Sequence, residues 1–353
     1  MNEHRSQDKP FDIPKWVVWE AFQRVKANKG AAGVDGQSIE DFERDRDRNL
    51  YRIWNRMSSG SYFPPPVRAV EIPKSGGGVR VLGVPTVADR VAQTVAAMYL
   101  ERKVEPAFHE DSYGYRPNRS ALDAVGKCRE RCWKFDWVVD LDIQKFFDSV
   151  PWELMLKAVS HHIDMDRRWI LLYVERWLHA PLRQTDGKIT VRDRGTPQGS
   201  AISPVLANLF MHYAFDAWME REFPDLPFER YVDDAVVHCK TERQAQMLVL
   251  VIGRRMRRVG LSLHPGKPRS CTAGTGGGGS SPSTPLSPSS ATRSGPAPLP
   301  TGTGGSSRRS CPRSAKTPSR RSALKCGAGG CTCMERIRWT NSHDGSTRSC
   351  GAG

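Results

Sequence analysis

Two adjacent aspartates, Asp233 and Asp234, lie in the otherwise apolar stretch "RYVDDAVVHC" at residues 230–239. Carboxylates are depleted from strands and neighbouring ones repel, so a buried strand does not readily accommodate the pair. A tight hairpin would place both at its tip, because aspartate tolerates turn conformations. The tip is then either an ordinary solvated turn or a site for divalent cations that supply the missing positive charge. A third carboxylate elsewhere in the chain would favour the cations.

Asp142 in "VVDLDIQKFFDSV", residues 138–150, provides that third carboxylate. It follows an apolar strand and precedes a turn, about 90 residues before the double aspartate. Adjacent strand ends would bring the three carboxylates together. Three carboxylates can hold two Mg²⁺ ions, which clamp the attacking and leaving oxygens of an in-line phosphoryl transfer. The glycine-containing segment "TPQGSAISPVLANLF" between the two motifs strengthens this interpretation.

The remaining sequence up to residue 270 alternates helical and strand patterns. The periodicity predicts helices around a loop over 14–57 and two strands joined by the glycine turn 76–78 within 67–86. It then predicts a helix after each of the strand motifs, and one long helix after the glycine-containing segment. The expected helical stretches after residue 87 are 88–108, 120–132, 152–160, 166–178 and 241–259, and the long helix follows the glycine-rich turn within 194–222.

The last 83 residues differ in composition from everything before them. Residues 271–353 contain no Val, Phe or Tyr and are dominated by Gly, Ser, Pro and Thr. Such a segment cannot bury enough apolar surface to offset its ordering entropy, so we expect disorder. This tail also holds six of the nine cysteines and +9 of the formal net charge of +15. The "CTC" at 331–333 has no second ligand pair at a zinc-like spacing.

The beginning of the chain and its apolar runs bear on location. The opening "MNEHRSQDKPFDIPKW" lacks the apolar segment of a secretory signal, and no apolar run is long enough to span a bilayer. These features predict a cytoplasmic protein without a membrane partner.

Taken in order, the motifs resemble reverse transcriptases of the group II intron maturase type. The resemblance covers roughly residues 15–267. "KANKGAAGVDGQSIEDF" is similar to the amino-terminal extension of this family, and "SYGYRPNRSALDAV" to its Tyr/Phe-Gly-Phe/Tyr-Arg-Pro block. "YVDD" matches the catalytic box, where the family more often has Ala in place of Val232. That difference leaves the carboxylates unchanged.

The resemblance implies an α+β fold, the fingers and palm of a right-hand polymerase with an antiparallel palm sheet backed by helices. The expected divisions are a helical N-terminal extension at 1–59, fingers and palm at 60–267, and a disordered tail at 268–353. The implied activity is RNA-directed DNA synthesis with two Mg²⁺ ions, together with assistance to intron splicing and mobility. The implied partners are a group II intron RNA, an RNA template, a DNA primer and deoxynucleoside triphosphates.

The resemblance also assigns roles at the catalytic centre. Asp142, Asp233 and Asp234 would be the metal ligands, and the backbone carbonyl of Ile143 would complete one metal's shell. Phe147 matches the residue that packs under the incoming sugar, where a ring would exclude a ribose 2′-hydroxyl. From its residue type alone, Phe147 is equally interpretable as a core aromatic.

Five further residues match substrate-binding or proton-donating positions of the family. Lys74 and Arg80 match finger residues that grip the triphosphate, although either could be an ordinary solvated strand charge. Gln198 and Gly199 match the block that shapes the base pocket, where glycine permits close backbone approach; the alternative is a simple helix entry. Lys267 matches a candidate proton donor to pyrophosphate.

After Lys267 the family pattern stops, and the genetic code suggests why. The third base of each codon can be joined to the first two bases of the next codon, which gives a shifted reading frame. With a suitable choice of synonymous codons, this frame lets Ser270–Gly276 encode "IVYCRDG" and residues 287–298 encode "FTFLGYTFRPRA". In the same frame, the final residues from Ile337 can encode "PLDELARRVDPVVRGWM". All three outputs resemble the family's thumb and maturase regions in the proper order. We therefore expect that the reading frame is lost near Lys267–Pro268.

Several functions stay open at this point. The chain could be an RNA-binding maturase that does not polymerise, or an inactive truncated remnant. Among enzymes, retron, diversity-generating and CRISPR-associated reverse transcriptases are the alternatives. The three carboxylates favour an enzyme, because RNA binding alone does not need them.

Overall fold

The computed structural model describes residues 9–73, 78–264 and 269–272, the last four by their backbone only. The predictions that concern Lys74, Lys267 and the tail from residue 273 onward lie outside the described residues. Within the described ranges, no helix is long and apolar enough to cross a membrane.

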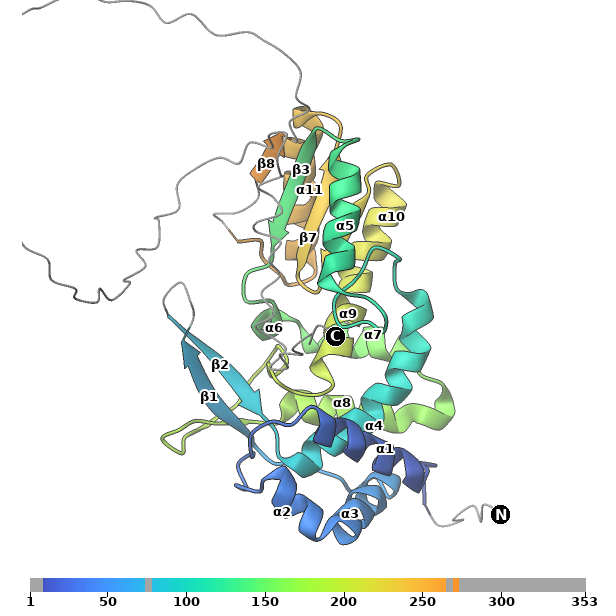
Figure 1. The fold of residues 1–353 in the computed structure, drawn as a ribbon, viewed down its shortest axis with the longest axis vertical. Helices are drawn as coiled ribbons and strands as arrows, with labels where there is room; N and C mark the ends of the chain where they lie inside the picture. Colours follow the sequence, from blue (N-terminus) through green and yellow to red (C-terminus); the bar gives the residue numbers. More distant parts are fainter. Residues whose placement is uncertain (1–8, 74–77, 265–268, 273–353) are drawn as a thin grey trace, which may run out of the picture.

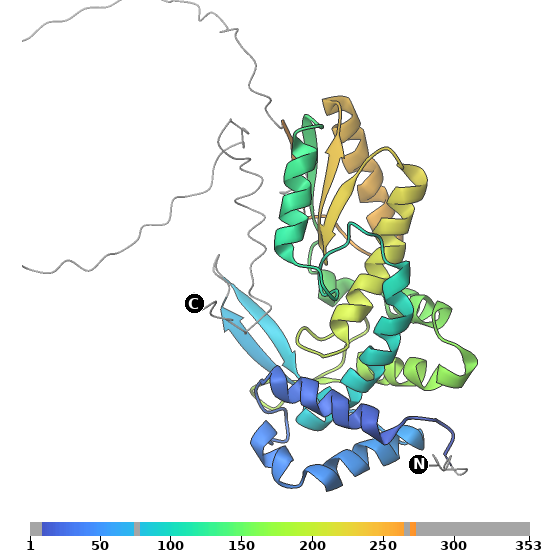
Figure 2. The same ribbon diagram turned by 45° about the vertical axis from the view of Figure 1, so that its right-hand side comes forward.

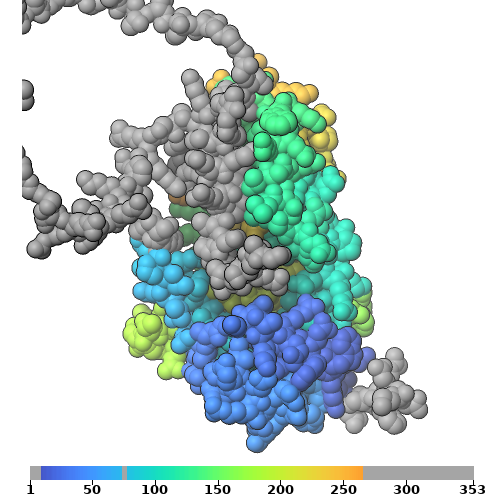
Figure 3. Space-filling model, viewed as in Figure 1, coloured from blue at the N-terminus to red at the C-terminus, as the bar shows by residue number. Residues whose placement is uncertain are grey.

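Three helices close the lower end of the molecule. They are α1 (Lys15–Ala27), α2 (Ile39–Arg44) and α3 (Arg46–Ser58), and they form the base of the molecule in Figures 1 and 3. α2 begins after its cap residue Ser38, whose side chain accepts a hydrogen bond from the backbone N–H of Asp41. Apolar side chains of α1, among them Val18 and Phe22, pack against the long helix α4 (Val87–Val104).

The predicted strand pair at 67–86 projects from this base as a ribbon (Figure 1). β1 (Val67–Pro73) and β2 (Val79–Val84) are antiparallel, and Val70 lies opposite Leu82. Two short strands, β4 (Leu182–Arg183) and β5 (Ile189–Thr190), extend the sheet in the order β2-β1-β4-β5.

A helical middle layer joins this ribbon to the upper half of the molecule. Large apolar side chains such as Trp169, Tyr173 and Phe146 are fully buried there, so this layer forms much of the hydrophobic core. Its elements are α4, η1 (Glu105–Ala107), α6 (Phe146–Ser149), α7 (Trp152–His161), η2 (Met165–Arg167), α8 (Arg168–His179) and α9 (Ser203–Met211).

The upper half is built on a four-stranded sheet whose strands are antiparallel, as the family resemblance implied for the palm. Its strands are β3 (Trp137–Asp142), β6 (Phe228–Tyr231), β7 (Asp234–Cys239) and β8 (Arg269–Thr272), in the order β6-β7-β3-β8. α5 (Ala121–Cys132) covers one face and α11 (Glu242–Arg258) the other (Figure 2). Because side chains alternate between faces, Asp234, Val236 and His238 point toward the face with α5.

The structure differs from the sequence prediction at residues 269–272. We expected them to fall within the disordered tail, but they form β8, which pairs with β3 from Trp137 opposite Thr272 to Asp140 opposite Arg269. An edge strand offers unpaired backbone N–H and C=O groups that any extended segment can satisfy. Strand pairing therefore extends into a segment whose side-chain composition does not predict it.

The helix predicted after the glycine-containing segment is also interrupted. It runs as α9, then the π-helical turn η3 (His212–Asp216), then α10 (Ala217–Glu222). A π turn inserts an extra residue and rotates the helix face, and it occurs frequently at functional sites. Here Asp216, the last residue of the turn, is completely buried.

The "SYGYRP" segment packs against the β6–β7 hairpin. Arg230 donates its backbone N–H to the carbonyl of Asp111 (2.9 Å) and accepts one from Tyr113 (2.8 Å). Gly114 follows, and a Cβ atom on it would lie 2.6 Å from Cγ2 of Val232 and 2.8 Å from the backbone nitrogen of Val232. Glycine is required there because the hairpin leaves no room for a side chain.

Substitution of Gly114 by alanine tests this contact. We expect Gly114→Ala to lower the free energy of unfolding by about 1–3 kcal/mol, because the clash is partly with backbone. The matched control is Gly126→Ala, since Gly126 lies within α5 and an added Cβ would meet nothing within 4 Å. Alanine should stabilise that helix by roughly 0.5–1 kcal/mol. Urea unfolding gives the free energy of unfolding of both variants. Equal changes for Gly114→Ala and Gly126→Ala would contradict the packing argument.

Candidate active site at the tip of the β6–β7 hairpin

The three candidate carboxylates meet at one end of the upper sheet. β6 and β7 are joined by the two-residue loop Val232–Asp233, with Tyr231 paired to Asp234 across it. Asp142 ends the neighbouring strand β3 and lies directly opposite Asp234. Directly opposed residues of antiparallel strands have Cβ atoms about 4.5–5.5 Å apart. The predicted hairpin and the predicted adjacency of strand ends are both present.

The hairpin loop holds a valine in a strained conformation. Val232 has a φ of 60° and is 4 % exposed. A positive φ is a genuine outlier for a β-branched residue, and such strain persists only where surrounding contacts fix it. Two contacts do so, the close approach of Gly114 and a hydrogen bond from Nη1 of Arg230 to the carbonyl of Val232 (2.8 Å).

Arg230 is the centre of a buried hydrogen-bond network behind the loop. Its side chain is fully buried, as is that of Asp216, and the two form a bidentate pair with both distances at 2.6 Å. The remaining donors reach Asn208 Oδ1 (3.1 Å), Ser112 Oγ (2.7 Å) and the Val232 carbonyl. All five guanidinium N–H groups are thus used, as a buried charge requires.

The position of Asp233 is electrostatically unfavourable for a carboxylate. Burial, assisted by the charge of Asp142, raises its pKa to about 6, although a backbone hydrogen bond and the charges of Arg80 and Arg230 act in the opposite direction. Apolar side chains, including Leu141, Ile143 and Met211, line a small cavity with Asp233. The carboxylate is therefore half-buried beside a like charge, which is the environment a cation would relieve.

The donor set at this end of the sheet suits Mg²⁺. Three carboxylates offer hard oxygen ligands, and two of them lie on directly opposed strand residues. The Ile143 backbone is ordered by an isolated bridge to Leu263, and the neighbouring Gln144 N–H donates to the Ser262 carbonyl (2.8 Å). The residues present therefore fit the metals that the sequence predicted.

Arg80, Gln198 and Gly199 lie together where β2 meets the glycine-containing segment. Nε of Arg80 donates a hydrogen bond to Oε1 of Gln198. The Gly83 N–H donates to the Gln198 carbonyl (2.7 Å), and a Cβ on Gly199 would lie 2.7 Å from the Gly83 carbonyl oxygen. With a φ of 104°, Gly199 also adopts a conformation that other residues rarely take.

A second buried network holds this segment against the helices. Asp89 is fully buried and accepts hydrogen bonds from Tyr62 (2.9 Å), Gln93 (2.9 Å) and Trp177 (2.8 Å). Gln93 in turn accepts one from Ser200 Oγ (2.6 Å). The segment after Gly199 is thereby fixed to α4 and α8.

Phe147 lies in α6, next to the ordered core. It is 7 % exposed and contacts Phe146 edge-on, with ring centroids 5.3 Å apart. Its backbone carbonyl accepts a hydrogen bond from the N–H of Thr196 (2.7 Å), the first residue of the glycine-containing segment. Both interpretations, sugar contact and core packing, are compatible with this position.

Sequence reasoning did not identify the residues that support the hairpin from behind. Arg230 directly precedes the catalytic box, and a charged residue inside an apolar strand was the one available signal. Asp216, Asn208 and Asp89 gave no such signal, because only the fold brings them to their partners.

Removal of the buried guanidinium tests its structural role. We expect Arg230→Met to lower the free energy of unfolding by about 3–5 kcal/mol, because Asp216 would be left buried and unpaired. The double variant Arg230→Met/Asp216→Leu should recover much of the loss. The control is Arg24→Met, whose ion pair with Glu20 is exposed and contributes at most about 1 kcal/mol. Urea unfolding of all three measures the difference; a cost for Arg230→Met no larger than the control's would refute the assignment.

The raised pKa of Asp233 predicts a pH-dependent stability effect. Its folded-state pKa of about 6 exceeds the ordinary value of 3.8, so charging Asp233 costs stability; the cost appears as the pH rises above about 4 and is complete above about 6. In metal-free buffer, Asp233→Asn should therefore stabilise the protein by about 1–2 kcal/mol at pH 7.5. The gain should disappear near pH 4, where Asp233 is protonated. Thermal unfolding at both pH values, with and without Mg²⁺, provides the measurement. A gain that is the same at both pH values would contradict it.

Comparison of the sequence with known proteins identifies its family. The family described as "Reverse transcriptase (RNA-dependent DNA polymerase)" matches residues 72–295, which extends past Lys267. Protein YkfC of Escherichia coli is 34 % identical over 60 % of this chain and 56 % of its own length. A putative COX1/OXI3 intron 1 protein of Saccharomyces cerevisiae is 30 % identical over 62 % of this chain and 26 % of its own length.

The group II intron-encoded protein LtrA of Lactococcus lactis is 29 % identical over 56 % of this chain and 32 % of its own length. The chain thus spans about half the length of YkfC and about a third or less of the other two. Two of these three relatives are described as intron proteins. The chain belongs to the reverse transcriptase family and, within it, resembles the group II intron-encoded reverse transcriptases and maturases.

Proposed function

We propose that this chain carries the fingers and palm of an RNA-directed DNA polymerase encoded by a group II intron. The observation that carries the proposal is the meeting of Asp142, Asp233 and Asp234 at one strand end, with Asp142 directly opposite Asp234. An RNA-binding protein without polymerase activity gains nothing from a half-buried carboxylate beside two others. The same argument favours an enzyme over a purely RNA-folding maturase.

The three carboxylates, with the Ile143 carbonyl, would hold two Mg²⁺ ions. Bound there, these ions would stabilise the attacking and leaving oxygens of nucleotidyl transfer. The chain's own residues position the reactants. Arg80, whose charge acts on Asp233, would bind the triphosphate of the deoxynucleotide through its planar fork. Gln198 and the Gly199 backbone would line the pocket for the templating base, with Arg80 orienting Gln198.

The partners follow from the same family resemblance. A group II intron RNA would be the bound RNA, with an RNA template and a DNA primer as substrates, and splicing assistance as a second activity. Lys74 and Lys267, outside the described residues, would add a phosphate contact and a proton donor.

The tail bears on how much primer extension the 353-residue chain itself would perform. If the frame is lost near Lys267, the thumb that grips the primer–template duplex is missing, and positioning supplies much of the rate of phosphoryl transfer. Feeble extension by the 353-residue chain is the expected result. Insertion of one base near the Lys267–Pro268 codons, with the downstream DNA supplied, should restore extension. Processive synthesis by the unaltered chain would contradict the frame argument.

The carboxylate assignment is tested in that frame-restored protein. Asp142→Asn should lower primer extension by at least about 100-fold while intron RNA binding persists, because the amide keeps the volume but weakens metal ligation. Asp140→Asn is the control, since Asp140 lies two residues earlier on the same strand and face but has no assigned ligand role. Extension assays and RNA-binding titrations measure the two effects. Near-normal extension by Asp142→Asn would remove the assignment.

Discrimination against ribonucleotides tests Phe147. Phe147→Ala should raise the ratio of ribonucleotide to deoxyribonucleotide incorporation, because the ring that excludes the 2′-hydroxyl is lost. Phe146→Ala is the matched control: Phe146 is 2 % exposed and adjacent, so its loss should reduce stability without changing the ratio. Single-nucleotide incorporation kinetics give the ratio. An unchanged ratio in Phe147→Ala would leave core packing as the role of this ring.

A further inference from the structure

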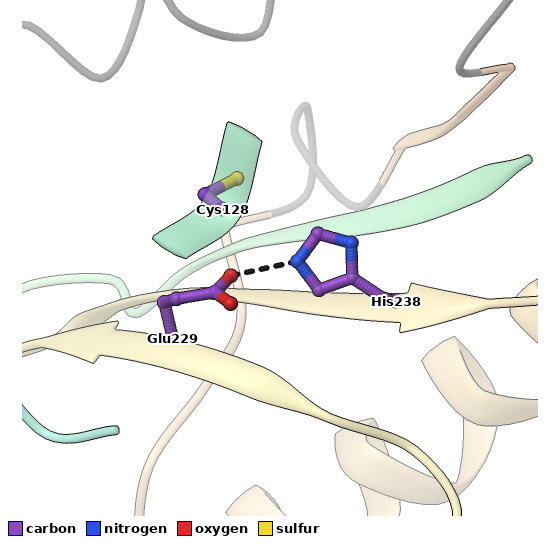
Figure 4. A group of neighbouring side chains, drawn as sticks. All are labelled: Cys128, Glu229 and His238. Carbon is purple, nitrogen blue, oxygen red and sulfur yellow. Dashed lines mark hydrogen bonds and ion pairs between the residues drawn. The ribbon is translucent and has the colours of Figure 1, made fainter. Parts of the chain in front are cut away.

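Four chemically reactive side chains meet between α5 and the upper sheet, away from the hairpin tip. Cys128 and Cys132 lie one turn apart on α5, Glu229 lies on β6, and His238 lies on β7. All four are buried, with exposed fractions of 1 %, 8 %, 1 % and 0 %. Figure 4 shows the Glu229 carboxylate and the His238 ring facing each other across a hydrogen bond, with Cys128 on the helix above them.

The spacing of these groups is close to that of a metal site. One ligand atom each of Cys128, Glu229 and His238 lies within 4.8 Å of the other two. Nε2 of His238 and Oε2 of Glu229 are 2.7 Å apart. Cys132 lies one turn after Cys128 on the same face of α5 and neighbours His238, but it is not one of these three ligands. Ligands around a tetrahedral Zn²⁺ are roughly 3.3–3.8 Å apart for bonds of 2.0–2.3 Å, so an approach of about 1 Å would bring these three ligand atoms to the spacing of a zinc site, and Cys132 would move in as the fourth ligand.

The fold gives each of these residues a fixed direction. Glu229 lies directly opposite Val236 in the β6–β7 pairing, so its side chain shares a face with Val236 and with His238 two residues later. Cys128 and Cys132, at i and i+4, share one face of α5. The next thiol, Cys239, points to the opposite face of the sheet, into the core beneath α11.

We propose that this cluster is a structural Zn²⁺ site with Cys128, Cys132, Glu229 and His238 as its four ligands. Sulfur, imidazole and carboxylate form a zinc donor set, distinct from the all-oxygen set at the hairpin tip. The metal would replace the hydrogen that joins Glu229 to His238. It would fasten α5 to both strands of the hairpin that carries Asp233 and Asp234.

The surroundings supply the outer contacts that zinc sites use. Arg131 binds the other carboxylate oxygen of Glu229 and also contacts Asp111, so the Glu229 carboxylate is held in a fixed orientation. Both cysteines would bind the metal as thiolates.

The test uses the full-length chain in which the six cysteines from Cys271 onward are replaced by serine, which removes their thiolates as competing ligands. After equilibration with ZnCl₂ and exhaustive dialysis, elemental analysis should find about one zinc per chain. Cys128→Ala in this background should bind zinc at least about tenfold more weakly. The matched control, Cys239→Ala, removes an equally buried thiol from the opposite face and should retain the metal.

A spectroscopic measurement makes the test independent of any variant's folding. Co²⁺ added to the background protein should give thiolate-to-cobalt charge-transfer absorption, and Zn²⁺ should abolish that absorption and raise the unfolding temperature. The proposal is overturned if the background protein gives no such absorption or no retained zinc. It is also overturned if Cys128→Ala, folded by circular dichroism, binds zinc as well as Cys239→Ala does. The cluster would then be a buried hydrogen-bond network only.

Discussion

The buried ion pair between Arg230 and Asp216 is the interaction on which the hairpin depends. Removing two charges from water costs several kcal/mol per ion, and the cost is offset only when every donor and acceptor is paired. Here all five guanidinium N–H groups are paired, and one of them holds the carbonyl of the strained Val232. The pair therefore does more than stabilise a core. It fixes a loop conformation that neither valine nor two adjacent aspartates would adopt without support.

The Asp89 network plays the corresponding role for the glycine-containing segment. Through Gln93 it fixes Ser200, directly after Gly199, and Gly199 in turn lies against the backbone of β2. The hairpin aspartates and the Arg80–Gln198 pair are thus each held in place by a separate buried polar network. Asp233 destabilises the fold when charged, and these networks keep its geometry fixed despite that cost.

Features that depend on nearby residues could be predicted from the sequence, and features that depend on distant ones could not. The hairpin, the β1–β2 pair and the position of Asp142 follow from alternation, turn residues and the cost of burying paired carboxylates. The π turn at His212–Asp216 does not, because its extra residue is stabilised by Arg230, a distant partner. β8 was missed for a related reason, since the β3 edge pairs with its backbone irrespective of composition. Cys128 and His238 carried no motif and became neighbours only through the docking of α5.

Strand β7 connects the two ends of this half of the molecule. Asp234 and His238 lie on the same face of it, four residues apart, which corresponds to about 13 Å along the strand. The proposed zinc ligands and the carboxylates are thus held by one rigid element but differ in chemistry. Mg²⁺ prefers the oxygens at the hairpin tip, whereas thiolates and imidazole select zinc. A cation at the His238 end would fix α5 and both hairpin strands together. The carboxylates at the other end would then stay in position even while no substrate or Mg²⁺ offsets their mutual repulsion.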